Sequence, residues 1–304
     1  MIEFIQALGD PDVPFLRYAF ACGLFASLAF GVVGACVVVR RITYIAGSIA
    51  HCALGGIGAA LYLQERAGLS WCTPMLGAVV TAVAAALLIG IVTLYAQQRE
   101  DTVIGALWAV GMAVGLLFLA KTAGYVDPMV YLFGNILYIS RTDLWLVIGL
   151  DAIVVGLSVV WYNKLLAVCF DQEFARLRGV RVGFYYLTLL VLTALTVVML
   201  VRIVGIVMVI ALLTLPAAVA GQFAQRLWHM MALAVLFCMM FTTVGIGLSY
   251  GPNLPSGPVI IILAGAAYLI SLAAARLRHR IEEKQRRAEQ TPDTGPKVSR
   301  PEPN

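Results

Sequence analysis

The sequence predicts an all-α integral membrane protein, a polytopic bundle of about eight or nine transmembrane helices, some of them broken or re-entrant. Hydrophobic residues make up 62% of the 304 positions and charged residues only 12%, whereas an average soluble domain carries about 25% charged residues. Apolar runs of about 20 residues, long enough to cross a bilayer, follow one another along the chain. Helix is the expected state of each run, because an open strand would leave backbone groups unpaired in lipid.

Nine apolar runs are candidate spans, and their lengths place them at residues 15–39, 42–64, 75–95, 102–120, 144–162, 184–201, 203–222, 229–250 and 257–275. A shorter apolar piece near 127–138 is expected to be re-entrant or interfacial, because it is too short to span comfortably. The chain thus divides into a transmembrane domain, residues 1–275, and a charged tail, residues 276–304. The tail begins with a helix-like run, and its end is expected to be disordered because it has no apolar face to bury.

The distribution of Lys and Arg predicts an N-terminus outside and a C-terminus in the cytoplasm. Basic residues are concentrated in the tail and in the loops that share its side of the membrane, as the positive-inside rule requires of cytoplasmic segments. The net charge of +5 is therefore interpreted as a topology signal, and no nucleic-acid partner is expected. The first residues include Glu3, Asp10 and Asp12 without a basic stretch, so the first run is expected to be a permanent span and not a cleaved signal.

The six cysteines are interpreted as small core residues, because they form no C-x-x-C pair and most lie inside apolar runs. They are Cys22, Cys36, Cys52, Cys72, Cys169 and Cys238.

His51 is a candidate metal ligand, because ionisable side chains inside a span are costly and usually face a cavity or a partner. It follows Arg41 by ten residues, which at about 1.5 Å per residue puts it about 15 Å deep, near the middle of a core of about 30 Å. Glycines at 55, 56 and 58 follow it and favour either close helix packing or a broken helix. The alternative is a histidine that only bonds a neighbouring helix.

Asp151 is the second ionisable residue inside a span. It lies eight residues after Asp143, about 12 Å into the membrane by the same rise per residue. A structural hydrogen bond is one interpretation of this carboxyl group, and metal binding together with His51 is the other.

Residues 163–183 form the largest polar interruption, which the predicted topology places in the cytoplasm. The segment contains a helix-like stretch with acids first and arginines later, the order that the helix dipole favours. No phosphate-binding motif of the form G-x-x-x-x-G-K-[ST] occurs in the chain. If transport is driven by ATP, hydrolysis therefore takes place in another subunit.

Five stretches in order resemble the permease family of ABC importers for zinc, manganese and iron. They are VVVRRITYIAGSIAHCALGGIGAALYL at 37–63, YLFGNILYIS at 131–140, the pattern D-x-E-x-A-x-x-x-G at Asp171, Glu173, Ala175 and Gly179, VGIVMVIALLTLPAAVA at 204–220 with Pro216 expected to break a span, and LSYGPNLPSGPVIIIL at 248–263. The set covers nearly everything except the tail.

The resemblance implies a type II ABC importer-like fold and a transporter subunit in the inner membrane of a prokaryotic cell, not an enzyme. It implies that residues 163–183, with Asp171, Glu173, Ala175 and Gly179, form a cytoplasmic coupling segment that docks on an ABC ATPase subunit. Further implied partners are a second permease subunit, identical or paralogous, and an extracytoplasmic metal-binding protein. Zinc, manganese or iron would be the transported substrate, with no permanent cofactor, and His51 the ligand on its path.

One departure from the family pattern concerns position 47. Many similar permeases carry Asp there, four residues before the histidine and on the same helix face, whereas this chain has Gly47. Ser48 and Asp151 are candidate substitutes. Two other function classes stay open: a secondary transporter driven by an ion gradient, and an intramembrane serine protease that uses Ser256.

Overall fold

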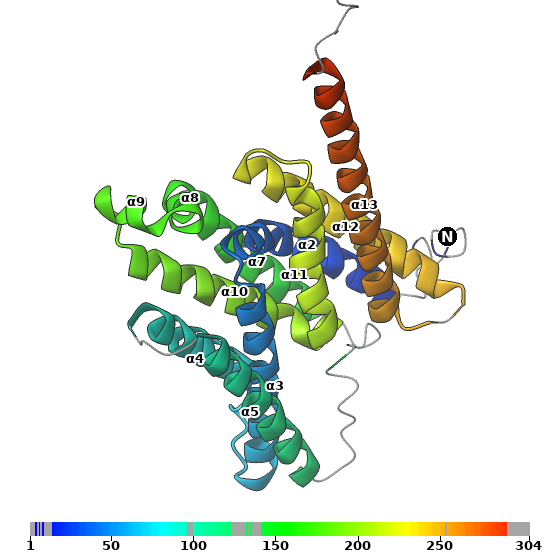
Figure 1. Ribbon diagram of the computed structural model, residues 1–304. Coiled ribbons are helices and arrows are strands. Elements are labelled where there is room, and N and C mark those ends of the chain that lie inside the picture. The colour runs from blue at the N-terminus through cyan, green and yellow to red at the C-terminus, as the bar shows by residue number, and fades with distance from the viewer. Residues whose placement is uncertain are drawn as a thin grey trace, which may run out of the picture.

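The computed structural model describes residues 14–95, 100–122, 141–252 and 254–290, together with single positions at 4, 6, 8, 132 and 134. Throughout this part of the chain the regular structure is helical (Figure 1). The helices are α2 (Pro14–Arg40), α3 (Thr43–Arg66), α4 (Pro74–Tyr95), α5 (Glu100–Lys121), α7 (Arg141–Val160), α8 (Tyr162–Phe170), α9 (Gln172–Leu177), α10 (Val182–Val204), α11 (Ile206–Gly221), α12 (Leu227–Tyr250) and α13 (Ser256–Gln290).

Eight of the described helices are long and apolar enough to cross a membrane, and α11 is a shorter apolar helix. The predicted all-α membrane bundle is therefore confirmed. The seventh predicted span, 203–222, differs in its bounds because the chain turns at Gly205, whose φ of 86° ends α10 and lets α11 begin at Ile206. The short piece predicted near 127–138 lies outside the described residues apart from positions 132 and 134.

Pro216 lies inside α11 and does not break it, contrary to the expectation from sequence. The helix continues from Pro216 to Gly221. Membrane helices tolerate proline because neighbouring groups can satisfy the backbone positions that it frees.

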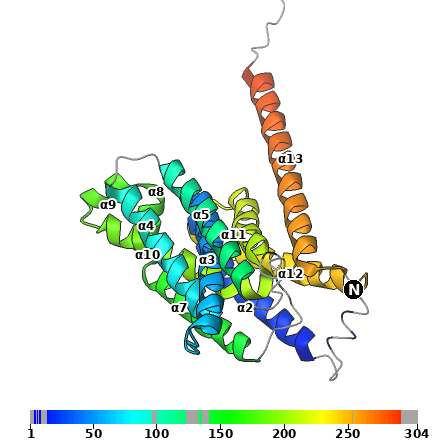
Figure 2. The same cartoon turned by 90° about the horizontal axis from the view of Figure 1, so that it is seen from below.

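The bundle has two groups of helices joined by α10. In one group α3 packs along both α4 and α5, and in the other α2 packs against α7, α11 and α12, with α13 on α11 and α12. Helix α10 contacts members of both groups. Figures 1 and 2 both show the last turns of α13 extending away from the bundle, so the run of charged residues from Arg276 to Gln290 continues this helix.

Helix α3 is uninterrupted, so its glycines serve close packing, the first of the two expected roles. A Cβ atom on Gly55 would lie 2.9 Å from the carbonyl oxygen of Gly111 in α5, and one on Gly58 would lie 2.5 Å from that of Gly115. Such distances leave no room for a side chain. Small residues at a helix contact let two backbones approach closely in a membrane, where burial of apolar groups does not drive helices together.

We predict that Gly58→Ala lowers the stability of the purified protein, because the added methyl group overpacks the contact between α3 and α5. Overpacking a well-filled core costs about 1–3 kcal/mol. The measurement is the midpoint of thermal unfolding in detergent. The matched control is Gly156→Ala in α7, where an added Cβ meets nothing within 4 Å. Equal midpoints for the two variants would contradict the proposed role of Gly58.

Candidate metal path and coupling segment

His51 lies in α3, which has the largest buried share of the eight candidate spans: 83% of its 18-residue apolar stretch is buried inside the bundle. The side chain is only 8% exposed, and its Nδ1 atom is buried without a hydrogen-bond partner. Its ring stacks on that of Trp108 from α5, with the centroids 4.5 Å apart and the planes inclined by 26°. The imidazole therefore has one buried nitrogen without a hydrogen-bond partner, while an aromatic ring covers one of its faces.

Trp108 also explains what occupies the space beside Gly47. A Cβ atom on Gly47 would lie 2.5 Å from Cζ3 and 2.8 Å from Cη2 of the Trp108 ring. Ser48, named above as a substitute ligand, donates its hydroxyl hydrogen to the carbonyl oxygen of Ile104 at 3.0 Å. The space that a side chain at position 47 would need is therefore occupied by the Trp108 ring from the neighbouring helix α5.

Asp151 lies on α7 and is 3% exposed. Its Oδ1 atom accepts a hydrogen bond of 3.0 Å from the backbone N–H of Ala29 in α2, and its Oδ2 atom is buried without a partner. Helix α7 packs on α2, α8 and α10, whereas α3 packs chiefly on α4 and α5. The structure thus places Asp151 and His51 on different helix pairs. Within the described ranges no three His, Cys, Asp or Glu side chains gather as a metal-binding group.

The predicted coupling segment contains the short helix α9, which has a capping residue at its N-terminal end and a helix-ending motif at its C-terminal end. Asp171 is its N-cap, and its carboxylate accepts a hydrogen bond of 3.0 Å from the backbone N–H of Phe174. At the other end the N–H of Val180 bonds the carbonyl of Ala175, and Gly179 adopts a φ of 75°. This is the pattern of a Schellman motif, in which glycine fits the left-handed position best. Three of the four motif residues therefore shape the helix.

The remaining surface of this segment includes apolar side chains that the sequence analysis did not single out. Phe170, Phe174 and Leu177 are 64%, 52% and 87% exposed, and Glu173 is exposed beside them. Phe174 and Leu177 are three residues apart in α9 and therefore share one side of that helix, whereas Phe170 is the last residue of α8. That spacing within a polar segment was the signal that could have identified them.

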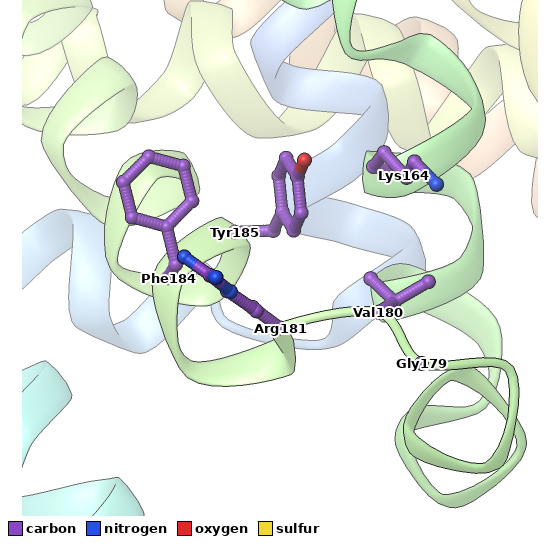
Figure 3. A pocket seen from close by; sticks show the side chains of 6 residues that line it. All are labelled: Lys164, Gly179, Val180, Arg181, Phe184 and Tyr185. Atoms are coloured by element: carbon purple, nitrogen blue, oxygen red, sulfur yellow. The ribbon is translucent and has the colours of Figure 1, made fainter.

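Two pockets adjoin the coupling segment. The first, about 300 Å³, is lined by Lys164, Gly179, Val180, Arg181, Phe184 and Tyr185, and Figure 3 shows the Lys164 and Arg181 side chains on either side of the Tyr185 ring. The second, about 520 Å³, has Phe170 in its wall together with Val38 and Val39 from the end of α2 and residues 221, 222 and 224–227 at the turn from α11 to α12. The end of α2, the coupling segment and the turn from α11 to α12 therefore meet at one end of the bundle.

Comparison with known proteins identifies the family. The chain matches the ABC 3 transport family over residues 12–275. The chain belongs to this family. An uncharacterized membrane protein of Synechocystis is 44% identical, over 91% of this chain and 95% of its own length. The manganese transport system membrane protein MntC of Halalkalibacterium halodurans is 31% identical, with 84% of this chain and 86% of its own length covered. A solved structure, PsaBC from Streptococcus pneumoniae in complex with Fab, is similar with a TM-score of 0.78, 29% identity, and coverage of 89% of this chain and 95% of that one.

Membership of the ABC 3 transport family confirms the resemblance drawn from the five sequence stretches, and with it a multi-pass permease subunit of an ABC transporter rather than an enzyme. For the protease alternative, His229 lies too far from Ser256 to serve as the partner of its hydroxyl group. Ser256 begins α13, just after α12 has ended, whereas His229 lies at the start of that helix, which is 24 residues long. At about 1.5 Å per residue the two side chains are separated by about 30 Å or more.

The six cysteines are free and buried, which confirms their interpretation as core residues.

We predict that Asp171→Ala loosens α9, because the first turn of the helix loses the acceptor for its free N–H groups. Loss of an N-cap typically costs about 1 kcal/mol. Hydrogen exchange of the amides from Gln172 to Leu177 should accelerate several-fold, as measured by mass spectrometry on the purified protein. Asp171→Asn retains a capping oxygen and should exchange at nearly the original rate, so equal acceleration in both variants would exclude the capping role.

Proposed function

We propose that this chain is the membrane permease of an ATP-driven importer for a divalent transition metal: zinc, manganese or iron. The observation that carries the proposal is the buried His51, which keeps one ring nitrogen without a partner inside the most enclosed span. A neutral imidazole is the commonest protein ligand for metals of this group. The named function of the relative from Halalkalibacterium halodurans, manganese transport, supports a metal as the substrate.

His51 is the ligand that we place on the path of the ion. A single protein ligand binds a passing ion only weakly, which suits transport because the ion has to dissociate again. Asp151 is the second candidate, since its Oδ2 atom has no partner. It would act at a separate position against α2, because the hydrogen bond to Ala29 holds it there.

Helix α9 is the proposed docking site for the ATPase subunit. The exposed side chains of Phe174 and Leu177 offer apolar area, and Glu173 offers a charge beside them. Asp171, Ala175 and Gly179 would act by holding the helix in shape. Closure of two ATPase subunits around ATP would then move two permease subunits between outward-open and inward-open states.

The proposed orientation keeps the N-terminus outside and the C-terminus in the cytoplasm of a prokaryotic inner membrane. It is supported by the distribution of Lys and Arg and by the meeting of the α2 end, the coupling segment and the turn from α11 to α12 at one end of the bundle. Residues 1–275 would form the membrane domain and 276–304 a cytoplasmic tail. An extracytoplasmic binding protein would deliver the ion to the opposite end, near residues 64–73 and 249–257.

We predict that His51→Ala lowers ATP-dependent metal uptake at least about tenfold, since even residues that only support a metal ligand change affinity about 10–100-fold. Uptake of radioactive zinc and manganese is measured in proteoliposomes that contain the permease, the ATPase subunit and the binding protein. His229→Ala is the matched control, because His229 is exposed at the start of α12. Full uptake by the His51 variant, assembled normally, would refute the role of the imidazole.

We predict that Leu177→Ser reduces copurification of the ATPase subunit with the permease, because the variant removes the most exposed apolar side chain of α9, 87% accessible. Loss of a contact residue at the centre of an interface costs about 2 kcal/mol, or about thirtyfold in affinity. The control is Leu254→Ser, since Leu254 is also exposed, at 53%, but lies between α12 and α13. Metal uptake that persists with no ATPase subunit at all would instead favour a gradient-driven transporter.

A further inference from the structure

We propose that Trp108 is a specificity-determining residue of the His51 site, because its ring excludes every side chain, and so every carboxylate ligand, from position 47. The site would then prefer ions that bind well to nitrogen, zinc above all, over manganese. The inference rests on the proposed function, in which His51 lies on the path of the ion.

The Trp108 ring lies along one face of α3. It lies 4.5 Å from the His51 ring and 5.4 Å from the Tyr44 ring, measured between centroids. Between these two contacts it occupies the space where the Cβ atom of Gly47 would be, 2.5 Å from Cζ3. Residues 44, 47 and 51 share one helix face, so one indole ring covers this face over two turns.

Two hydrogen bonds beside Trp108 hold α5 against α3. The Ser48 hydroxyl donates to the carbonyl of Ile104 at 3.0 Å, and the Cys52 thiol donates to that of Leu107 at 3.3 Å. Both acceptors belong to the turn of α5 that carries Trp108. One turn further on, a Cβ atom on Gly111 would lie 2.8 Å from the sulfur of Cys52. Helix α5 therefore cannot slide along α3 to make room for a side chain at position 47.

Without a side chain at position 47, the site has the His51 imidazole but no carboxylate beside it. Position 47 is one turn before His51, where a carboxylate would share its face and could bind the same ion. The ring of Trp108 denies that position, and Asp151 is held on another helix pair. Imidazole suits zinc, iron and copper, whereas carboxylate oxygen suits manganese, and manganese is also the weakest binder in the divalent series. An imidazole without a neighbouring carboxylate thus favours zinc over manganese.

The test restores a carboxylate and removes the obstacle at the same time. The variant Gly47→Asp/Trp108→Ala is compared with Gly47→Ala/Trp108→Ala, which has the same opened space but no ligand oxygen. Uptake of zinc and of manganese is measured in proteoliposomes of the complete transporter. We expect the manganese-to-zinc uptake ratio of the Asp variant to exceed that of its control about tenfold, the ratio that a difference of about 1.4 kcal/mol in binding produces.

The steric part of the proposal has its own measurement. Gly47→Ala alone should lower the midpoint of thermal unfolding, and adding Trp108→Ala should cost less than the two single changes together, because the two side chains compete for one space. Additive effects would show that position 47 is not closed by the Trp108 ring and would overturn the proposal. If Gly47→Asp/Trp108→Ala fails to assemble, Gly47→Asp/Trp108→Leu and its Gly47→Ala/Trp108→Leu control retain more apolar volume.

The outcomes separate this inference from the proposed function. Equal manganese-to-zinc ratios in the Asp variant and its Ala control, with uptake still dependent on His51, would overturn the role of Trp108 and leave the metal permease intact. Loss of the His51 requirement would overturn the site itself. If Trp108 only packs against α3 and has no influence on selectivity, the manganese-to-zinc uptake ratio should be the same in the Asp variant and its Ala control. This ratio therefore distinguishes a specificity-determining residue from a structural one.

Discussion

Close approach of α3 to α4 and α5 is the constraint on which the rest of the structure depends. Apolar side chains gain little by leaving lipid for a protein interior that is equally apolar, so helices in a membrane associate through fit and hydrogen bonding. Here the fit comes from glycine against glycine, as at Gly58 and Gly115. Because the two backbones nearly touch, His51 and Trp108 face each other at a fixed register, and the composition of the candidate site follows from that register.

In the proposed coupling segment, most residues of the sequence motif stabilise the local fold of the chain. Asp171 caps α9, Ala175 is fully buried on the inner side of this helix, and Gly179 is the residue with left-handed backbone conformation that ends it. A helix of six residues has little stability of its own, so both end signals are needed to keep it formed. Phe174 and Leu177, whose side chains are exposed to a partner, occupy positions that the motif D-x-E-x-A-x-x-x-G leaves unspecified.

The sequence predicted the existence of the spans well because hydropathy and length determine them almost independently of tertiary contacts. It failed where a distant contact decides the outcome. The end of α10 depends on one backbone angle at Gly205, and Pro216 stays within a helix because neighbours tolerate it. The meaning of Gly47 could not be read either, since Trp108 lies about 60 positions away and no local pattern links the two residues.

Helix α10 connects the two halves of the proposed mechanism. It begins at Val182, at the end of the coupling segment, and contacts α9 as well as α3 and α4. Packed helices resist continuous deformation, so a displacement of α9 would carry α10 with it and shift its contacts on α3 as a unit. The other group has a different attachment, because the Asp151 carboxylate ties α7 to the backbone of α2 at Ala29. Movement of α10 between a group fastened by that hydrogen bond and one fastened by glycine contacts would change its contacts with α3, the helix that carries His51, without unpacking either group.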